Sequence, residues 1–160
     1  MKDFNSQIIL GIDPGTHRMG WGIIQAEKRK ATYLDCGVIE ERKETKAEQL
    51  LALYKGLSAL IEKHRPEMIG IEKLFFMKNQ TTAMAVAEAR GVVLLLAAEN
   101  NLPVVEVAPT EVKQCVTGYG QADKKAVTKM VKLILGTDKL KVLDDATDAL
   151  AIAISAMILK

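Results

Sequence analysis

Cysteine, histidine and aromatic residues are all scarce in this 160-residue chain. The two cysteines, Cys36 and Cys115, form no CxxC pair, so the sequence offers neither a disulfide framework nor a zinc-binding spacing. The two histidines are too few for a metal or catalytic site built on imidazole. Any metal site in this chain must therefore be sought among the carboxylates.

Long hydrophobic runs are also missing near both ends of the chain. The uncharged stretch Ala149–Leu159 is far shorter than the roughly 20 residues that a membrane span needs. The first ten residues lack the extended apolar segment of a signal peptide. We therefore expect a cytoplasmic protein with reduced cysteines and no membrane partner.

The overall composition is close to that of an average globular protein. Apolar residues make up 49% and charged residues 26%, which excludes disorder and collagen-like structure as descriptions of the whole chain. The length suits one hydrophobic core, so we expect residues 1–160 to form a single domain. Residues 111–142 contain a local excess of lysine, but a net charge of +2 is small, and charge alone favours a solvated helix face over a polyanion site.

The hydrophobic periodicity changes along the chain from that of strands to that of helices. Strands are predicted at residues 8–13, 19–26 and 31–39, joined as an antiparallel meander, and at residues 68–72 and 103–107. Helices are predicted at residues 46–65, 81–100, 123–135 and 144–159, with a short helix opening at Pro109. This order predicts an α/β fold with a mixed five-stranded sheet flanked by helices on both faces. The segment Gly91–Ala98 is apolar all round, which indicates a helix that is deeply buried or shared with a partner.

Carboxylates occupy the ends of two predicted strands and the start of the last helix. Asp13 ends the first strand and Glu72 ends the fourth. Asp145 and Asp148 are three residues apart and share one face of the last helix, while Asp144 is a candidate N-cap. Taken singly, each strand acid is typical of a solvated rim residue. Asp148 is harder to explain in that way, because nearly all the residues after it are apolar.

These acids would converge if the first and fourth strands are neighbours and the last helix packs beside them. Four carboxylates in one cleft repel one another and raise their own pKa values. A hard divalent cation relieves that repulsion, and ligands that are all oxygen suit Mg²⁺ or Mn²⁺. Two such ions about 3.5–4 Å apart form the machinery of phosphodiester hydrolysis. The spacing alone leaves this convergence a hypothesis.

Several motifs together resemble the RuvC family of Holliday junction resolvases. They are Gly11-Ile12-Asp13-Pro14-Gly15-Thr16 with Gly20-Trp21-Gly22, then Ile71-Glu72, Glu88-Ala89-Arg90-Gly91, residues 109–114 and residues 145–153. They occur in the family's order over nearly the whole chain. The resemblance implies an RNase H-like fold and a homodimer. It implies that the homodimer makes paired nicks in four-way DNA junctions during recombination and repair. The implied cofactor is Mg²⁺, for which Mn²⁺ would substitute. It also implies a branch-migration helicase of the RuvA and RuvB type as a partner.

The same resemblance assigns roles to individual residues. It implies that Asp13, Glu72, Asp145 and Asp148 are the catalytic, metal-binding acids. It implies that Lys113 and Lys124 bind DNA, with Lys125 as an adjacent candidate. It implies that an aromatic side chain after the fourth strand stacks on junction bases, and both Phe75 and Phe76 are candidates.

Three other functions share part of this pattern. Sugar-kinase and actin-like ATPases also open with Asp-x-Gly-Thr, but they need two lobes, which a chain of 160 residues does not provide. The YqgF type of short RNase H-like protein shares the first motif but fits the last helix less well. A non-catalytic nucleic-acid-binding module would have no reason to keep four acids together.

Overall fold

The computed structural model describes residues 6–40, 45–74, 80–137 and 144–160. Each predicted strand and helix is found within two residues of its expected bounds where bounds were given. The strands are β1 (Ser6–Pro14), β2 (Arg18–Glu27), β3 (Lys30–Glu40), β4 (Met68–Glu72) and β5 (Val104–Val107). The helices are α1 (Lys46–His64), α2 (Gln80–Glu99), α3 (Pro109–Thr117), α4 (Lys124–Leu135) and α5 (Asp144–Leu159).

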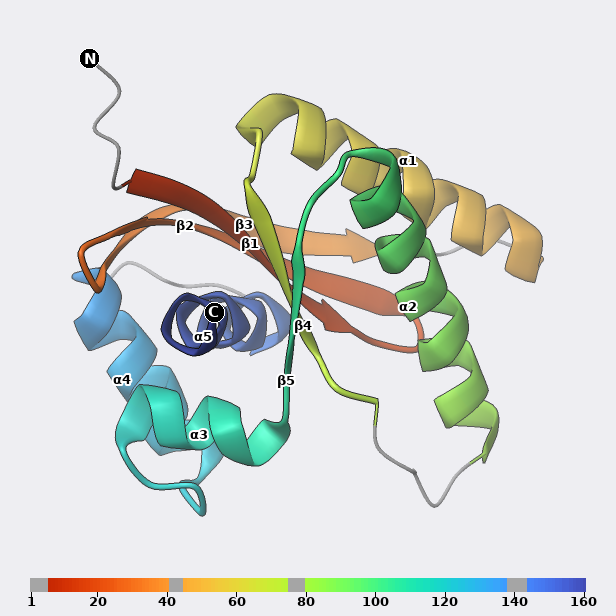
Figure 1. Cartoon of the computed structure of the whole chain (residues 1–160). Helices are drawn as coiled ribbons and strands as arrows, with labels where there is room; N and C mark the ends of the chain where they lie inside the picture. Colours follow the sequence, from red (N-terminus) through yellow and green to blue (C-terminus); the bar gives the residue numbers. More distant parts are fainter. Residues whose placement is uncertain (1–5, 41–44, 75–79, 138–143) are drawn as a thin grey trace.

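One mixed sheet in the order β3-β2-β1-β4-β5 carries all five strands. The first three strands form the expected antiparallel meander, and β4 and β5 add to it in parallel. Figure 1 shows α1 and α2 on one face of the sheet and α5, with α3 and α4, on the other. The predicted fold class is therefore confirmed, including the adjacency of the first and fourth strands on which convergence of the acids depends.

Each face of the sheet has its own hydrophobic core, because successive strand residues point to opposite sides. Ile9 of β1 packs into the core on the α5 face, and its neighbour Leu10 packs into the core under α1 and α2. The inner strand β4, between β1 and β5, is buried on both sides from Met68 to Ile71. The sheet is therefore covered on both sides around the ends of β1 and β4, where the acids lie.

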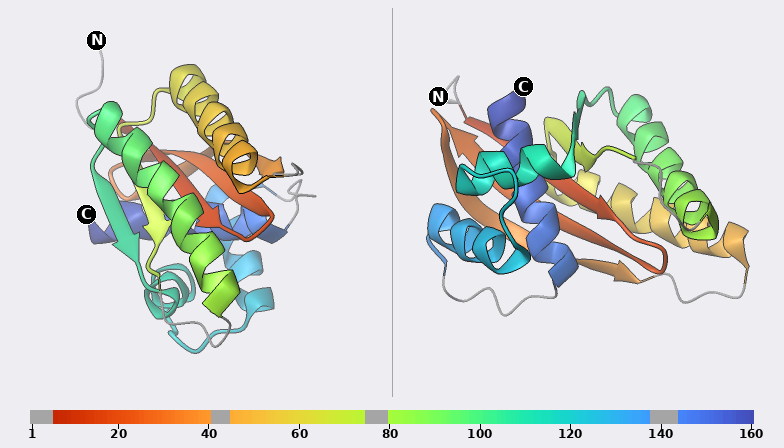
Figure 2. Two further views of the ribbon diagram at one scale, coloured as in Figure 1. Left: turned by 90° about the vertical axis from the view of Figure 1, so that its right-hand side faces the viewer. Right: turned by 90° about the horizontal axis from the view of Figure 1, so that it is seen from below.

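A row of glycines lets α5 approach the sheet closely. Gly11 of β1 pairs with Gly22 of β2 and with Gly70 of β4, so three glycines lie side by side across neighbouring strands. A Cβ atom at Gly11 would overlap the backbone of α5 at Ala149, and one at Gly70 would lie 2.7 Å from the Cβ of Ala156. The helix backbone therefore rests almost directly on the sheet. In Figure 2, right, α5 crosses the strands at this level.

The helix α1 is fixed at both ends by local signals. Thr45 and Glu48 form a reciprocal capping box at its start. Arg65, in the left-handed conformation at φ 49°, ends it just before Pro66, and its N–H donates to the carbonyl of Ile61. These signals explain why the helix covers the expected residues.

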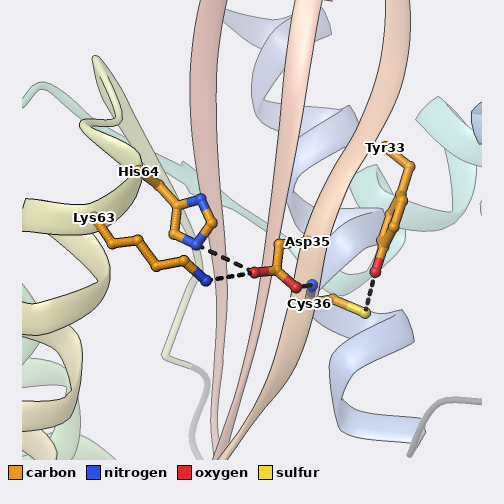
Figure 3. A network of polar contacts seen from close by, with 5 residues as sticks. All are labelled: Tyr33, Asp35, Cys36, Lys63 and His64. Atoms are coloured by element: carbon orange, nitrogen blue, oxygen red, sulfur yellow. Dashed lines mark hydrogen bonds and ion pairs between the residues drawn. The ribbon is translucent and has the colours of Figure 1, made fainter.

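A polar network ties the end of α1 to β3, as Figure 3 shows. The Asp35 Oδ2 atom lies 3.2 Å from both Lys63 Nζ and His64 Nε2. On the other side of the strand, the Cys36 thiol lies 3.6 Å from the Tyr33 hydroxyl. Neither cysteine of the chain forms a disulfide. The network therefore supports the edge of the sheet and has no part in the acid site.

The helix α2 is buried on one side only. By length and composition it could cross a membrane, and 33% of the relevant window is buried inside the protein. Its inner face includes Val93 and Leu96, whereas Met84, Leu94 and Leu95 on other sides are exposed. The sequence predicted that this helix is either deeply buried or shared with a partner. The structure shows that it is not deeply buried, because one apolar face is exposed.

Candidate active site

The two strand acids are neighbours at one edge of the sheet. In the parallel pairing of β1 and β4, Ile12 lies beside Ile71, so Asp13 and Glu72 follow at the same level. Each acid comes two residues after a glycine of the row and therefore points to the α5 face. Both are partly buried. The register of the sheet thus places two carboxylates under the start of α5.

The start of α5 brings two further carboxylates to this edge. Asp13, Asp145 and Asp148 each offer an oxygen atom, and these atoms all lie within 4.8 Å of one another. Gly20 makes this approach possible, because a Cβ there would overlap the backbone oxygen of Asp145. Glu72 lines the same cavity as Asp13 and Asp148. The four acids expected to converge are therefore brought together.

Asp144 differs from its neighbours on the same helix. The helix begins at Asp144, so this residue occupies the first helical position and is not the N-cap that the sequence suggested. Its side chain is 78% exposed and lies 3.6 Å from Lys124. It adds negative charge at the positive end of the helix dipole but does not belong to the cluster of converging oxygens.

A cavity of about 280 Å³ opens beside the acids and is also lined by basic side chains. Lys113 of α3 and Lys124 of α4 both line it. Lys125, the adjacent candidate, is exposed and is not among the lining residues. The structure therefore brings Lys113 and Lys124 to the site and leaves Lys125 outside it. Phe75 and Phe76 lie outside the described residues.

Burial and mutual repulsion make the acids reluctant to ionise. Burial, followed by the charges of Glu72, Asp148 and Asp145, raises the pKa of Asp13 to about 7. Burial and then the charge of Asp148 raise the pKa of Glu72. Burial also raises the pKa of Asp148, although the hydrogen bond and charge of Lys124 oppose that rise. Asp13 is therefore partly protonated near neutral pH in the absence of another cation.

Two basic side chains pair with the acids of the helix. Lys124 Nζ lies 3.2 Å from Asp148 Oδ2, and the pKa of Lys124 is raised because pairing with Asp148 and Asp144 outweighs its partial burial. Arg18, at the start of β2, forms an ion pair with Asp145 through its Nε atom. Arg18 was not among the site residues predicted from the sequence. Nothing in the sequence around Arg18 indicates a role in the site, because its ion pair with Asp145 forms only when α5 packs on the sheet.

A buried arginine supports the backbone of Glu72. Arg90 of α2 is 8% exposed, and its Nη1 atom donates to the carbonyl oxygen of Glu72. Its Nη2 atom lies 2.7 Å from Glu106 of β5. The Lys73 N–H, one residue further on, donates to the carbonyl of Val107. Arg90 therefore ties three elements together at the acid edge. Arg90 is the single basic residue of α2, and this was the signal in the sequence that could have revealed its role.

A hard divalent cation fits this donor set. Each of the three clustered side chains supplies carboxylate oxygen, the ligand type that Mg²⁺ and Mn²⁺ prefer. Burial first, and then repulsion from the other three acids, raise the pKa of Asp13, although Arg18 and Lys124 pair with two of those acids. The arrangement can therefore hold a cation next to a cavity whose lysines attract phosphate.

Comparison with known proteins shows similarity over nearly the whole chain. The family model described as "Crossover junction endodeoxyribonuclease RuvC" matches residues 9–156. A protein of that name from Natranaerobius thermophilus is 47% identical over 148 residues, covering 92% of each chain. A solved structure, "T. thermophilus RuvC in complex with Holliday junction substrate", superposes with a TM-score of 0.87 at 32% identity, covering 93% of this chain and 92% of the other. The yeast mitochondrial resolvase Ydc2, at 17% identity and a TM-score of 0.65, shares the fold.

Proposed function

Because this chain belongs to the RuvC family of crossover junction endodeoxyribonucleases, we propose that it cuts four-way DNA junctions with divalent cations held by Asp13, Glu72, Asp145 and Asp148. The observation that carries the proposal is the convergence of carboxylate oxygens within 4.8 Å beside a lysine-lined cavity. The T. thermophilus structure, whose substrate is a Holliday junction, supports the choice of DNA. The match across residues 9–156 favours this function over an ATPase or a non-catalytic module.

The proposed site contains residues that bind the cation, residues that bind phosphate and one residue that positions a cation ligand. When bound, Mg²⁺ or Mn²⁺ would activate the attacking water and stabilise the leaving 3′ oxygen. Asp13 and Glu72 would hold that cation from the sheet, and Asp145 and Asp148 would hold it from α5. Lys113 and Lys124 attract the phosphodiester and orient it over the acids. Arg90 fixes the carbonyl of Glu72 and with it the position of that carboxylate.

The raised pKa of Asp13 gives the acid site a further property. A proton held there near neutral pH must leave before the carboxylate can bind a cation. Since the other acids supply part of the repulsion that raises this pKa, cation binding and proton release are coupled. The cation-free site therefore avoids carrying four full negative charges while it approaches DNA.

We also propose that the chain works as a homodimer through the outer face of α2. Met84 and Leu95 on this helix are 65% and 54% exposed, and a Cβ added at Gly91 would meet nothing within 4 Å. A two-fold pair of such faces would bury apolar surface and give two active sites for two DNA strands. Sedimentation of the wild type as a monomer at micromolar concentration, with full activity, would contradict this.

A RuvA- and RuvB-type helicase partner is proposed on the family resemblance alone.

The activity is tested with a synthetic four-way junction and a linear duplex of the same sequence. We expect symmetric nicks in the junction only, in Mg²⁺ or Mn²⁺ and not in EDTA. Asp13→Asn serves as the matched variant, because it keeps the shape of the side chain but removes its charge. Normal cleavage by Asp13→Asn would overturn the proposed role of the acids.

A further inference from the structure

Arg18 places a protein cation on one of the proposed cation ligands. Its Nε atom pairs with Asp145 Oδ2, and Asp145 contributes to the cluster whose oxygens lie within 4.8 Å of one another. The side chain of Arg18 is 48% exposed, whereas that of Asp145 is 24% exposed. The acid is therefore held in the site, while about half of the Arg18 side chain remains open to solvent.

A second hollow lies on the Arg18 side of the acids. It has a volume of about 450 Å³ and is lined by Asp145 together with Gly15, Thr16, His17, Arg18 and Glu40. The lysine-lined cavity described above includes Asp13 and Asp148 but none of these residues. The acid cluster therefore lies between two hollows, one with Lys113 and Lys124 and the other with Arg18.

Arg18 and a divalent cation would compete for Asp145. A guanidinium and a metal ion on one carboxylate repel each other at short range. The metal is the stronger competitor, because Asp13 and Asp148 bind it at the same time, whereas the ion pair of Arg18 is partly exposed and weak. The long, half-exposed side chain can leave Asp145 without any change in β2.

A released Arg18 would stand beside the path of a DNA strand that crosses the acids. His17 is exposed, and Glu40 adds a negative charge to the same hollow. Among the described residues that line this hollow, Arg18 is therefore the one side chain that is always cationic. A guanidinium suits this task because its fork of N–H donors matches a phosphate group.

We propose that Arg18 exchanges partners during the reaction: it pairs with Asp145 until a divalent cation binds, and then it contacts a backbone phosphate on the β1–β2 side of the scissile position. The inference rests on the proposed function, because it requires both the cation and the DNA strand. It adds a phosphate contact opposite Lys113 and Lys124, so that the strand would be held on both sides of the acids.

The first arm of the test measures cation binding without DNA. Mn²⁺ is titrated into wild type, Arg18→Gln, Asp13→Asn and the control Arg29→Gln, and binding is followed by calorimetry. Arg29 is an exposed arginine in the β2–β3 turn, at the opposite end of β2. We expect Arg18→Gln to bind Mn²⁺ about three- to five-fold more tightly than wild type, since a competing surface ion pair is removed. Arg29→Gln should match wild type.

The second arm measures junction affinity against salt concentration, in Ca²⁺ and in EDTA, with the strands checked for cleavage. In Ca²⁺, Arg18→Gln is expected to lower the log–log slope by about one unit, because one phosphate contact is lost. In EDTA, where Arg18 pairs with Asp145, the change in slope should be clearly smaller. Equal slopes for wild type and Arg18→Gln in Ca²⁺ would overturn the phosphate contact.

The two arms separate this inference from the proposed function. If Asp13→Asn binds Mn²⁺ as well as wild type, the acids do not form the cation site and the proposed function fails. If Asp13→Asn binds poorly but Arg18→Gln binds Mn²⁺ like wild type, the site stands and only the exchange of partners is overturned.

Discussion

The acids from the strands and the acids from the helix reach the same site in different electrostatic states. Asp145 and Asp148 each have a basic partner, Arg18 and Lys124. Among the described residues, no basic side chain lies within ion-pair distance of Asp13 or Glu72. The pKa of Asp13 is accordingly raised to about 7, chiefly by burial.

This difference shows how the protein tolerates four carboxylates in one cleft. The helix acids are compensated by the protein's own cations, which come from the start of β2 and the start of α4. The strand acids lack such partners: burial raises the pKa of both, that of Asp13 to about 7, and the proposed cation would replace the proton that Asp13 holds. In the cation-free protein, one half of the site is therefore paired with basic side chains, and the other half has no such partner.

The largest expected effect on cleavage comes from neutralising one strand acid, Asp13, or one helix acid, Asp145. Asp13→Asn and Asp145→Asn should both lose cleavage by roughly a thousand-fold or more, because each removes a metal ligand. Their stabilities should differ. Asp13→Asn should stabilise the metal-free fold by about 2 kcal/mol at pH 8, after allowing for solvent screening, since it removes an unpaired, buried charge. Asp145→Asn should give no such gain, because it leaves Arg18 without its partner.

Cleavage assays and urea unfolding in EDTA test this pair of variants. Equal stability gains for Asp13→Asn and Asp145→Asn would show that the strand and helix acids do not differ electrostatically. Junction binding should survive in both variants, because phosphate affinity comes mainly from the lysines.

A methyl group under α5 should separate the helix acids from the strand acids. Gly11→Ala is expected to destabilise the fold by about 3 kcal/mol, because the new Cβ meets helix backbone that cannot rotate away. Cleavage should fall with it, even under conditions where the variant is fully folded. Gly120→Ala is the control, since its nearest neighbours would lie at 3.6 Å, an ordinary contact distance. Similar melting temperatures for the two variants would contradict the close approach.

The pH dependence should report the strand acids. Below pH 7, where Asp13 is protonated, the affinity for Mn²⁺ is expected to fall by up to about ten-fold per pH unit. The folded-state pKa lies above that of the unfolded chain, so the folded metal-free protein holds the extra proton between about pH 4 and pH 7. Its stability should therefore fall as the pH rises through this range and level off above 7.

Thermal unfolding in EDTA from pH 5 to pH 8, with Asp13→Asn alongside, isolates this contribution. The stability difference between variant and wild type should grow with pH and then remain constant. A difference that shrinks with rising pH would have the opposite sign and would rule out a raised pKa at Asp13.

Removing Lys124, the basic partner of Asp148, should affect DNA binding more than it affects the stability of the fold. Lys124→Ala takes one cation from the wall of the cavity, so the log–log salt slope of junction binding should fall by about one unit. Lys125→Ala is the matched control, because Lys125 does not line the cavity. Equal changes in slope for the two variants would place both lysines on the DNA path.

The smallest effect is expected at Asp144. Its side chain is largely exposed and its pairing with Lys124 is shared with Asp148, so Asp144→Asn should change stability by less than about 0.5 kcal/mol and leave cleavage within about two-fold. The parallel assay with Asp145→Asn checks the register of the helix. An inactive Asp144→Asn beside an active Asp145→Asn would mean that the two neighbours have exchanged roles.

Much of the fold could be predicted from the sequence because local signals agree with the final packing. The period of the apolar residues, the Pro66 stop and the turn after Asp13 mark the elements. The acids were found because Asp148 stands out in an apolar helix and because Asp13 and Glu72 end their strands. Their convergence still depended on β1 pairing with β4, which no local pattern specifies.

The partners of the acids could not be predicted in the same way. Arg18 lies 127 positions from Asp145 and Lys124 lies 24 positions from Asp148, so neither pairing follows from helical or strand spacing. The glycine row was equally hidden. Gly11, Gly22 and Gly70 become one surface only after three strands are aligned. Such features depend on tertiary register, which periodicity within a segment does not contain.

The glycine row also makes α5 respond to a local change as one rigid body, because its backbone is packed directly on the sheet. Ala156, which rests on Gly70, lies eleven residues along the helix from Asp145, a distance of about 16 Å at the usual rise per residue. Because the contacts under the helix involve backbone and Cβ atoms, a bulge beneath one end would tilt the whole element and not a single side chain. Position 70 is therefore mechanically coupled to the proposed metal ligands, and we expect a small substitution there to slow cleavage although the residue lines neither the acid cluster nor the cavity beside it.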